Sequence, residues 1–127
     1  YINSKIETSI ISDGSIIHSA TIKGSIVGLR SRVGSGSSIE ASILMGADYF
    51  ETQEEIKQNE ANGKISIGVG SNCIIRKAIV DKNARIGNNV KIINEKGTQN
   101  HESGNYMIRD GIVIVYKNAT VPSGTVI

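Results

Sequence analysis

A six-residue pattern that returns along the chain constrains the fold more than any other feature. It reads as Ile, a charged residue, any residue, a Ser or Ala, a second Ile and a further aliphatic residue, and it occupies 6–11, 22–27, 39–44 and 75–80. The first three copies recur at spacings of 16 and 17 residues, and the fourth follows after 36, about two such periods. Stretches that contain Gly or Asn, the residues of tight corners, separate the copies.

A period near 17 residues that is built from six-residue pieces predicts a triangular parallel β-helix, in which each coil has three short strands and three corners. The leading Ile of each copy would point to the axis, and successive coils would stack at about 4.8 Å. The 23 Ile and nine Val residues against two Leu support this, because β-branched side chains fit strands. Changes such as Ile22→Ser or Ile39→Asp should break a coil.

An antiparallel sandwich with Gly-rich turns is the alternative fold, since it also uses short strands. Strands of a sandwich alternate with a period of two and need no recurring six-residue unit. The repeat therefore favours the solenoid, an all-β fold with a thin core of stacked Ile and Val.

Two segments interrupt the repeat. The stretch 48–64 is acidic and polar, Thr52 and Glu55 form a capping-box pattern, and Gly63 suits a helix C-terminus, so we expect a short exposed helix over 53–62. The stretch 94–106 is hydrophilic and predicts a long mobile loop.

Strand sequence resumes over 112–127 and closes a single β-helix domain that spans 1–127. Because position 1 is not Met, we expect a fragment of a larger protein. The first coil would expose unpaired strand edges, which another domain or subunit should cover.

Composition narrows the possible partners. A net charge of +2, with five aromatic residues and no Trp, does not indicate a nucleic-acid-binding face. No apolar run approaches the length that spans a bilayer, so no membrane partner is expected. A single cysteine, Cys73, excludes an internal disulfide and predicts a reducing compartment.

Few residues are candidates for catalysis. His18, in a coil strand, and His101, in the expected loop, are the only histidines that could serve as the base of a hexapeptide-repeat acyltransferase. Cys73 stands where the repeat requires a small apolar side chain, which predicts a buried structural thiol. No metal or phosphate-loop spacing is present. The acidic residues of the expected helix should be solvated: Glu51, Glu54 and Glu55.

Basic residues form the remaining signal. Five of them lie within 67–93 against one acid, Asp81. Lys82 and Arg85 flank a corner, and Lys117 follows a strand of the last coil. Neighbouring cations without counter-charges would bind phosphate or carboxylate groups. The alternative is a solvated basic face. The sequence does not show that Lys82 and Lys117 lie close together, because their spacing of 35 residues is about two coils but includes the expected loop.

Three segments carry a resemblance to a known family: SIVGLRSRVGSGSSIEASILMGADYFET, SIGVGSNCIIRKAIVDKNARIGNNVKIIN and GIVIVYKNATVPSGTVI. They resemble the C-terminal domain of glucose-1-phosphate adenylyltransferase of the plant and cyanobacterial type. The resemblance implies a left-handed parallel β-helix. It also implies an enzyme that makes ADP-glucose and pyrophosphate from ATP, with Mg²⁺, and glucose 1-phosphate for starch or glycogen synthesis.

The resemblance assigns regulation and assembly, not catalysis, to this chain, because the family's catalytic residues lie in an N-terminal nucleotidyltransferase domain that is absent here. No cofactor is expected in the β-helix itself. Two lysines match residues of the family that bind the effectors 3-phosphoglycerate and phosphate: Lys82 in DKNARIG and Lys117 in VYKNATVPSGT. Arg30, in VGLRS, and Arg85 are weaker candidates for an interface or a position near the effector.

Partners and location also follow from the resemblance. The expected partners are the catalytic domain of the same polypeptide, the subunits of a homo- or hetero-tetramer, and small phosphorylated effectors. The location would be the plastid stroma in a plant or alga and the cytoplasm in a cyanobacterium. Two other classes are weighed against this one. A trimeric acyltransferase would need a catalytic histidine, and an ice-binding or scaffold solenoid would carry Thr-x-Thr arrays, which do not occur.

Overall fold

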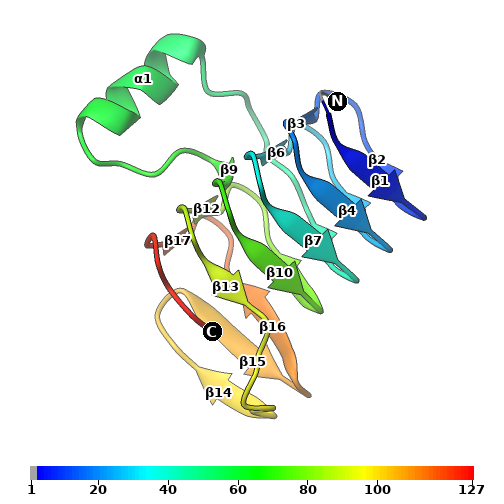
Figure 1. Ribbon diagram of the computed structural model, residues 1–127. Coiled ribbons are helices and arrows are strands. Elements are labelled where there is room, and N and C mark those ends of the chain that lie inside the picture. The colour runs from blue at the N-terminus through cyan, green and yellow to red at the C-terminus, as the bar shows by residue number, and fades with distance from the viewer. Residues whose placement is uncertain (1–2) are drawn as a thin grey trace.

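The computed structural model describes residues 3–127, which wind into a three-sided parallel β-helix (Figure 1). Positions 1 and 2 of the expected domain lie outside the described residues. The first face holds β1 (Lys5–Glu7), β4 (Thr21–Lys23), β7 (Ser38–Glu40), β10 (Ile74–Arg76) and β13 (Lys91–Ile92). The second face holds β2 (Ile10–Ile11), β5 (Ile26–Val27), β8 (Ile43–Leu44), β11 (Ala78–Val80) and β16 (Ile112–Val115). The third face holds β3 (Ile16–Ile17), β6 (Arg32–Val33), β9 (Gly68–Val69), β12 (Arg85–Ile86) and β17 (Thr120–Val121).

The leading Ile of the repeat points to the axis, as predicted. Parallel pairing places these residues in one ladder, which we call the inner ladder: Ile6, Ile22, Ile39, Ile75 and Ile92. Ile22, Ile39 and Ile75 are each 0% exposed. Every pairing between coils is parallel, so the sandwich alternative is wrong. The two-period spacing is also wrong, because Ile39 pairs directly with Ile75 and the intervening residues leave the solenoid as one insertion.

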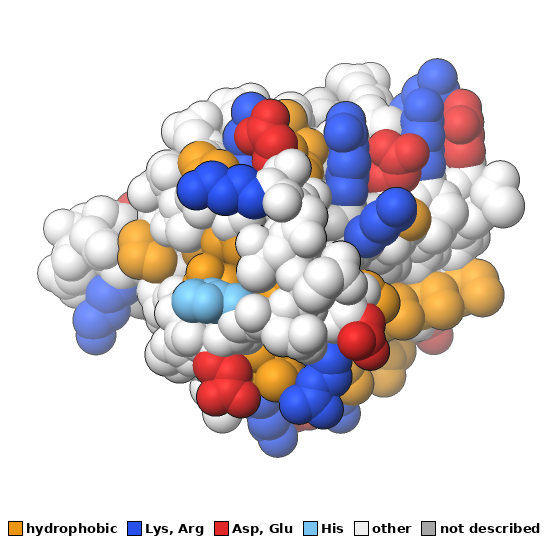
Figure 2. Space-filling view, turned by 90° about the horizontal axis from the view of Figure 1, so that it is seen from below, with side chains coloured by type: hydrophobic (Ala, Val, Ile, Leu, Met, Phe, Trp, Pro, Cys, Tyr) orange, Lys and Arg blue, Asp and Glu red, His pale blue; other side chains and the backbone are white. Residues whose placement is uncertain are grey.

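The second face carries an outward stack of isoleucines, which we call the outer ladder: Ile10, Ile26, Ile43, Ile79 and Ile114. Ile10, Ile26 and Ile43 are 65%, 45% and 40% exposed. The first face instead presents charges, with ion pairs such as Glu7–Lys23 and Glu40–Arg76. Figure 2 shows a row of hydrophobic side chains, with basic and acidic side chains in a second row.

The insertion leaves the corner after β8 and returns at β9, and it contains the one helix of residues 3–127, α1 (Gln53–Ala61). Thr52 accepts a hydrogen bond from the Glu55 N–H, and the Glu55 carboxylate accepts one from the Thr52 N–H, which is the predicted capping box. Gly63 follows with a φ of 70°. No residue of α1 is buried, and the helix stands beside the third face (Figure 1). Within the described residues, no helix is long and apolar enough to cross a membrane.

The second interruption is not the long loop that the sequence suggests. β14 (Asn100–Glu102) and β15 (Tyr106–Arg109) form an antiparallel hairpin that joins β16 and extends the second face (Figure 1). Its Ile108 is only 5% exposed, so it adds to the core. The sequence did not predict these strands because the segment is hydrophilic: β14 is exposed at all three positions and needs no apolar side chains. His101 therefore lies on a strand, not in a loop.

Candidate anion-binding site

The corner between the second and third faces brings Lys82 and Lys117 together. Each lysine precedes an Asn in the left-handed conformation, with φ of 61° at both Asn83 and Asn118. Asn tolerates this conformation better than most residues, so the coil can turn sharply there. The Asn118 N–H donates to the Lys82 carbonyl at 3.0 Å. The two lysines therefore occupy the same corner of adjacent coils, and not coils two apart, because the hairpin fills the remaining sequence.

Arg30 lies on the same corner, nearer the N-terminus. Its backbone is also left-handed, with a φ of 55°, and its N–H donates to the Asp13 carbonyl at 3.1 Å. Its Nε donates to the Ala47 carbonyl in the next coil at 2.8 Å. In its own coil Arg30 takes the left-handed position that Asn83 and Asn118 take in theirs, and we call the group of Arg30, Lys82 and Lys117 along this corner the basic edge. Both lysines are exposed and Arg30 is half-buried.

One carboxylate, Asp48, partly neutralises the basic edge. The Asn83 amide holds it from both sides, since Oδ1 accepts the Asp48 N–H at 2.9 Å and Nδ2 donates to Asp48 Oδ2 at 3.0 Å. Lys82 Nζ lies 3.5 Å from Asp48 Oδ1. The Asn83 hydrogen bond, followed by the charges of Lys82 and Lys117, holds the pKa of Asp48 below its usual value despite some desolvation.

Asn83 and Asp48 are therefore site residues that the sequence analysis missed. Asn83 is only 7% exposed, whereas Lys82 before it is exposed and Asp81 is half-buried. The sequence signal was weak, because Asp48 lies 35 residues away at the start of an insertion. A left-handed corner Asn can serve both the backbone turn and a side-chain partner, and this double role is visible only with the coils in register.

Arg85 does not belong to the basic edge. It points from β12 toward the insertion, where its guanidinium lies 3.1 Å from Glu51 Oε2 and donates to the Ile65 carbonyl at 2.8 Å. Glu51 also accepts hydrogen bonds from the Ile67 N–H and from the Asn59 amide. This cluster ties both ends of the insertion to the third face.

The expectation that Glu51 is solvated is wrong, because its side chain is only 7% exposed. Burial raises the pKa of Glu51, but hydrogen bonds from the Ile67 backbone and from Arg85 outweigh it, so the pKa lies below the ordinary value of 4.5. Glu51 precedes α1, whereas Glu54 and Glu55 lie in its exposed first turn. The basic stretch 67–93 is therefore less free of counter-charges than its composition suggests.

The candidate catalytic residues do not form a site. His18 and His101 are both exposed and lie on different faces, and the His101 ring is tilted relative to the Tyr106 ring, with ring centroids 5.9 Å apart. Cys73 is 0% exposed, which confirms the predicted buried thiol, and burial raises its pKa. Among residues 3–127, no group of three or more His, Cys, Asp and Glu side chains could hold a metal ion.

The basic edge is suited to bind anions rather than to make or break covalent bonds. Two ammonium groups and one guanidinium lie along one corner, and only Asp48 forms an ion pair with any of them within the described residues. Charge-assisted hydrogen bonds to phosphate or carboxylate oxygens are stronger than neutral ones, so a small polyanion could bridge adjacent coils.

Comparison with known proteins agrees with this architecture. The family model described as "GLGC left-handed parallel beta-helix domain" matches residues 1–126, which confirms the expected handedness. The small subunit of glucose-1-phosphate adenylyltransferase from Zea mays is 50% identical over 125 residues, which cover 96% of this chain and 100% of that sequence. The resemblance noted in the three segments is confirmed. The chain therefore belongs to the GLGC left-handed parallel β-helix domain family and is a relative of the small subunit of glucose-1-phosphate adenylyltransferase.

Proposed function

We propose that this chain is the regulatory and assembly domain of a glucose-1-phosphate adenylyltransferase, and that its basic edge binds the phosphorylated effector. The observation that carries the proposal is the position of Lys82 and Lys117 at one corner of adjacent coils, where the Asn118 N–H donates to the Lys82 carbonyl. The expected effectors are 3-phosphoglycerate as activator and phosphate as inhibitor. Each offers oxyanions that two ammonium groups can share.

Asp48 would set the affinity of this site. The ion pair between Lys82 and Asp48 is exposed, with both side chains 46% accessible, and such pairs contribute little to stability. An effector phosphate could therefore displace Asp48 from Lys82 at small cost. Asn83 keeps the carboxylate in place, so Asp48 would stay near the bound anion and weaken its binding by repulsion.

Regulation requires that the effector bind the active arrangement of the enzyme more tightly than the inactive one. The proposed partner across the effector is the N-terminal catalytic domain of the same polypeptide, which would supply further basic groups. Coupling of this kind is typically about 1 to 3 kcal/mol. The remaining partners that we propose are the other subunits of a homo- or hetero-tetramer.

The catalytic chemistry belongs to the catalytic domain. Mg²⁺ with ATP would be bound there in the full-length enzyme. The relative from Zea mays is a plant protein, and on that basis we propose the plastid stroma as the location.

The test uses the full-length enzyme with Lys82→Ala and Lys117→Ala. We expect each change to raise the activator concentration for half-maximal activation by about tenfold, with the unactivated rate retained, because one charge-assisted contact is lost. Lys91→Ala is the matched control, since Lys91 is also exposed but lies on the first face. If both variants respond to activator as the wild type does, the effector assignment is wrong.

A second variant tests the role of Asp48. Asp48→Asn removes the carboxylate charge and keeps a side chain of the same size, so the activator should bind more tightly, by a few-fold. Tighter binding would follow from relief of repulsion at the basic edge. Weaker binding would show that Asp48 positions Lys82 for the effector instead of opposing it.

A further inference from the structure

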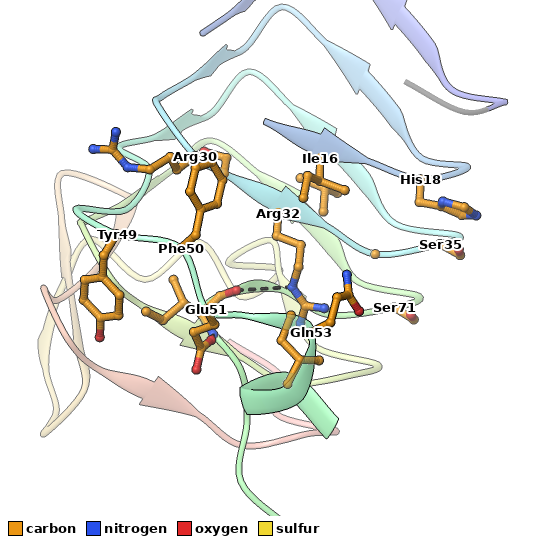
Figure 3. Close-up of a pocket in the computed structure, with 15 residues that line it drawn as sticks. Ile16, His18, Arg30, Arg32, Ser35, Tyr49, Phe50, Glu51, Gln53 and Ser71 are labelled. Carbon is orange, nitrogen blue, oxygen red and sulfur yellow. Dashed lines mark hydrogen bonds between the residues drawn. The ribbon is translucent and has the colours of Figure 1, made fainter. Parts of the chain in front are cut away.

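A cavity of about 320 Å³ separates the third face from the insertion (Figure 3). Its floor is formed by β3 and β6, and the side formed by the insertion includes Tyr49, Phe50 and Ile56. A cavity of this size is at the lower end of the range for small-molecule sites. Among the residues that line it, Glu51 is the one acid, and its charge is already matched by Arg85.

Arg30 and Arg32 both line this cavity, and neither forms an ion pair within residues 3–127; because Arg30 turns toward the basic edge, Arg32 is the guanidinium that faces the cavity (Figure 3). It stands in the same outward column of the third face as Arg85, because Val33 pairs with Val69, and Gly68 pairs with Arg85. Arg85 has a carboxylate partner, whereas no ion pair within residues 3–127 includes Arg32. Within the described residues, the Arg32 side chain makes one hydrogen bond, from Nε to the Ile67 carbonyl at 3.4 Å.

The guanidinium of Arg32 points into the space between sheet and insertion, while Arg30 points away from it toward the basic edge (Figure 3). The bond through Nε leaves both terminal amino groups of Arg32 available for a ligand. These two groups form the planar fork that matches a phosphate or carboxylate. Gln53, the first residue of α1, lies near Arg32 and adds an amide that can donate to the same anion (Figure 3).

Aromatic side chains at the cavity remain open to solvent. Tyr49 and Phe50 are 51% and 55% exposed. The Phe50 ring packs over Gly14, where a Cβ would lie 3.0 Å from Cζ of the ring, so the ring is held beside the cavity. A ligand with an apolar or ring-shaped body would cover such surface, which favours binding.

We propose that this cavity is a second anion site, separate from the basic edge, which takes a small organic anion. The phosphate or carboxylate group of the ligand binds the Arg32 fork, and its uncharged body packs against Phe50 and Ile56. Because one wall is the sheet and the other is the insertion, the bound ligand ties the insertion to the solenoid.

The chain contains no Trp, so single Trp substitutions give specific fluorescence reporters. Tyr49→Trp reports on the cavity, and Tyr116→Trp, next to Lys117, reports on the basic edge. The probes are phenyl phosphate, benzoate and inorganic phosphate, each titrated into the full 127-residue chain at constant ionic strength. Phenyl phosphate should saturate the Tyr49→Trp signal and bind several-fold tighter than inorganic phosphate, because the ring adds apolar contact. The ratio of phenyl phosphate to benzoate affinity identifies the preferred oxyanion.

Arg32→Gln in the Tyr49→Trp background should weaken phenyl phosphate binding by about tenfold or more. Arg32→Lys keeps the charge without the fork and should give an intermediate loss. Arg76→Gln, a change of the same kind on the first face, and Lys82→Ala should leave this signal unchanged. Equal affinity in Arg32→Gln and the parent, or equal losses in Arg32→Gln and Arg76→Gln, would overturn the proposal. Neither result would affect the effector assignment, which is tested separately in the full-length enzyme with Lys82→Ala and Lys117→Ala.

Discussion

The inner and outer ladders are built from the same residue in the same parallel stacking, yet they lie in opposite environments. Ile22, Ile39 and Ile75 of the inner ladder are 0% exposed. Ile26 and Ile43 of the outer ladder, four residues later in each copy of the repeat, are 45% and 40% exposed. Stacking of identical side chains therefore does not by itself make a core in this solenoid.

The corner between the first and second faces separates the two ladders. The third position of each repeat copy takes a left-handed conformation, as at Gly24, Ala41 and Lys77, with φ of 54°, 49° and 50°. The fourth position is small, and it is buried in the last three copies, as in Ser42, which donates to the Glu40 carbonyl and accepts the Ala78 N–H at 3.1 Å. This turn reverses the side that the next strand presents to the axis, so the second Ile points outward.

Substitutions that introduce a charge should give the largest difference in the free energy of unfolding between the two ladders. Ile39→Asp places a carboxylate in the axis without a partner, and we expect it to lower the free energy of unfolding by more than about 4 kcal/mol, enough to unfold a coil. Ile43→Asp, on the next strand, should cost about 1 kcal/mol through lost strand propensity and contacts. Urea denaturation followed by circular dichroism measures both.

Alanine substitutions give the same contrast if Ile39→Asp does not fold. Ile39→Ala should cost about 2 to 5 kcal/mol, as buried Ile usually does, and Ile43→Ala about 1 kcal/mol or less. Similar losses at the two positions would mean that the outer ladder is covered in solution, for example by another copy of the chain.

Much of the fold could be predicted from sequence because the repeat encodes it locally. The axis residues, the capping box at Thr52 and Glu55, and the buried Cys73 each follow from a short pattern. The alignment of coils across the interruptions could not be predicted, since 36 residues fit either two coils or one coil with an insertion. The proximity of Lys82 to Lys117 and the ion pair between Arg85 and Glu51 both depend on that alignment. For this reason the sequence left the first uncertain and did not indicate the second.

On the third face the insertion lies over outward side chains, so their contribution to stability can be compared with that of the open first face. Arg85 is an outward group of the third face that pairs with Glu51 of the insertion, whereas Glu40 and Arg76 form an open ion pair on the first face, 52% and 57% exposed. Glu51→Gln should lower the free energy of unfolding by about 1 to 2 kcal/mol, since hydrogen bonds that involve charged groups are lost. Glu40→Gln should change it by less than about 0.5 kcal/mol.

Denaturation curves of the two variants and the parent measure this difference. Hydrogen exchange adds a local readout, because release of Glu51 should speed exchange of the α1 amides before it affects the coils. Equal effects of the two substitutions would show that the insertion does not shield the Glu51–Arg85 pair from solvent.

The pH dependence of stability should distinguish the same two carboxylates with a smaller effect. The pKa of Glu51 is lowered from 4.5 in the folded chain, so the unfolded chain binds the proton more readily. The stabilisation from Glu51 is therefore complete well above pH 4.5 and is lost as the pH falls through the lower folded-state pKa. Protonated Glu51 resembles Gln, so the stability gap between the parent and Glu51→Gln should narrow as the pH falls from 7 to 3. The gap between the parent and Glu40→Gln should stay small throughout. A Glu51 gap that is constant over this range would mean that the lost hydrogen-bond geometry, and not the carboxylate charge, accounts for the cost of the substitution.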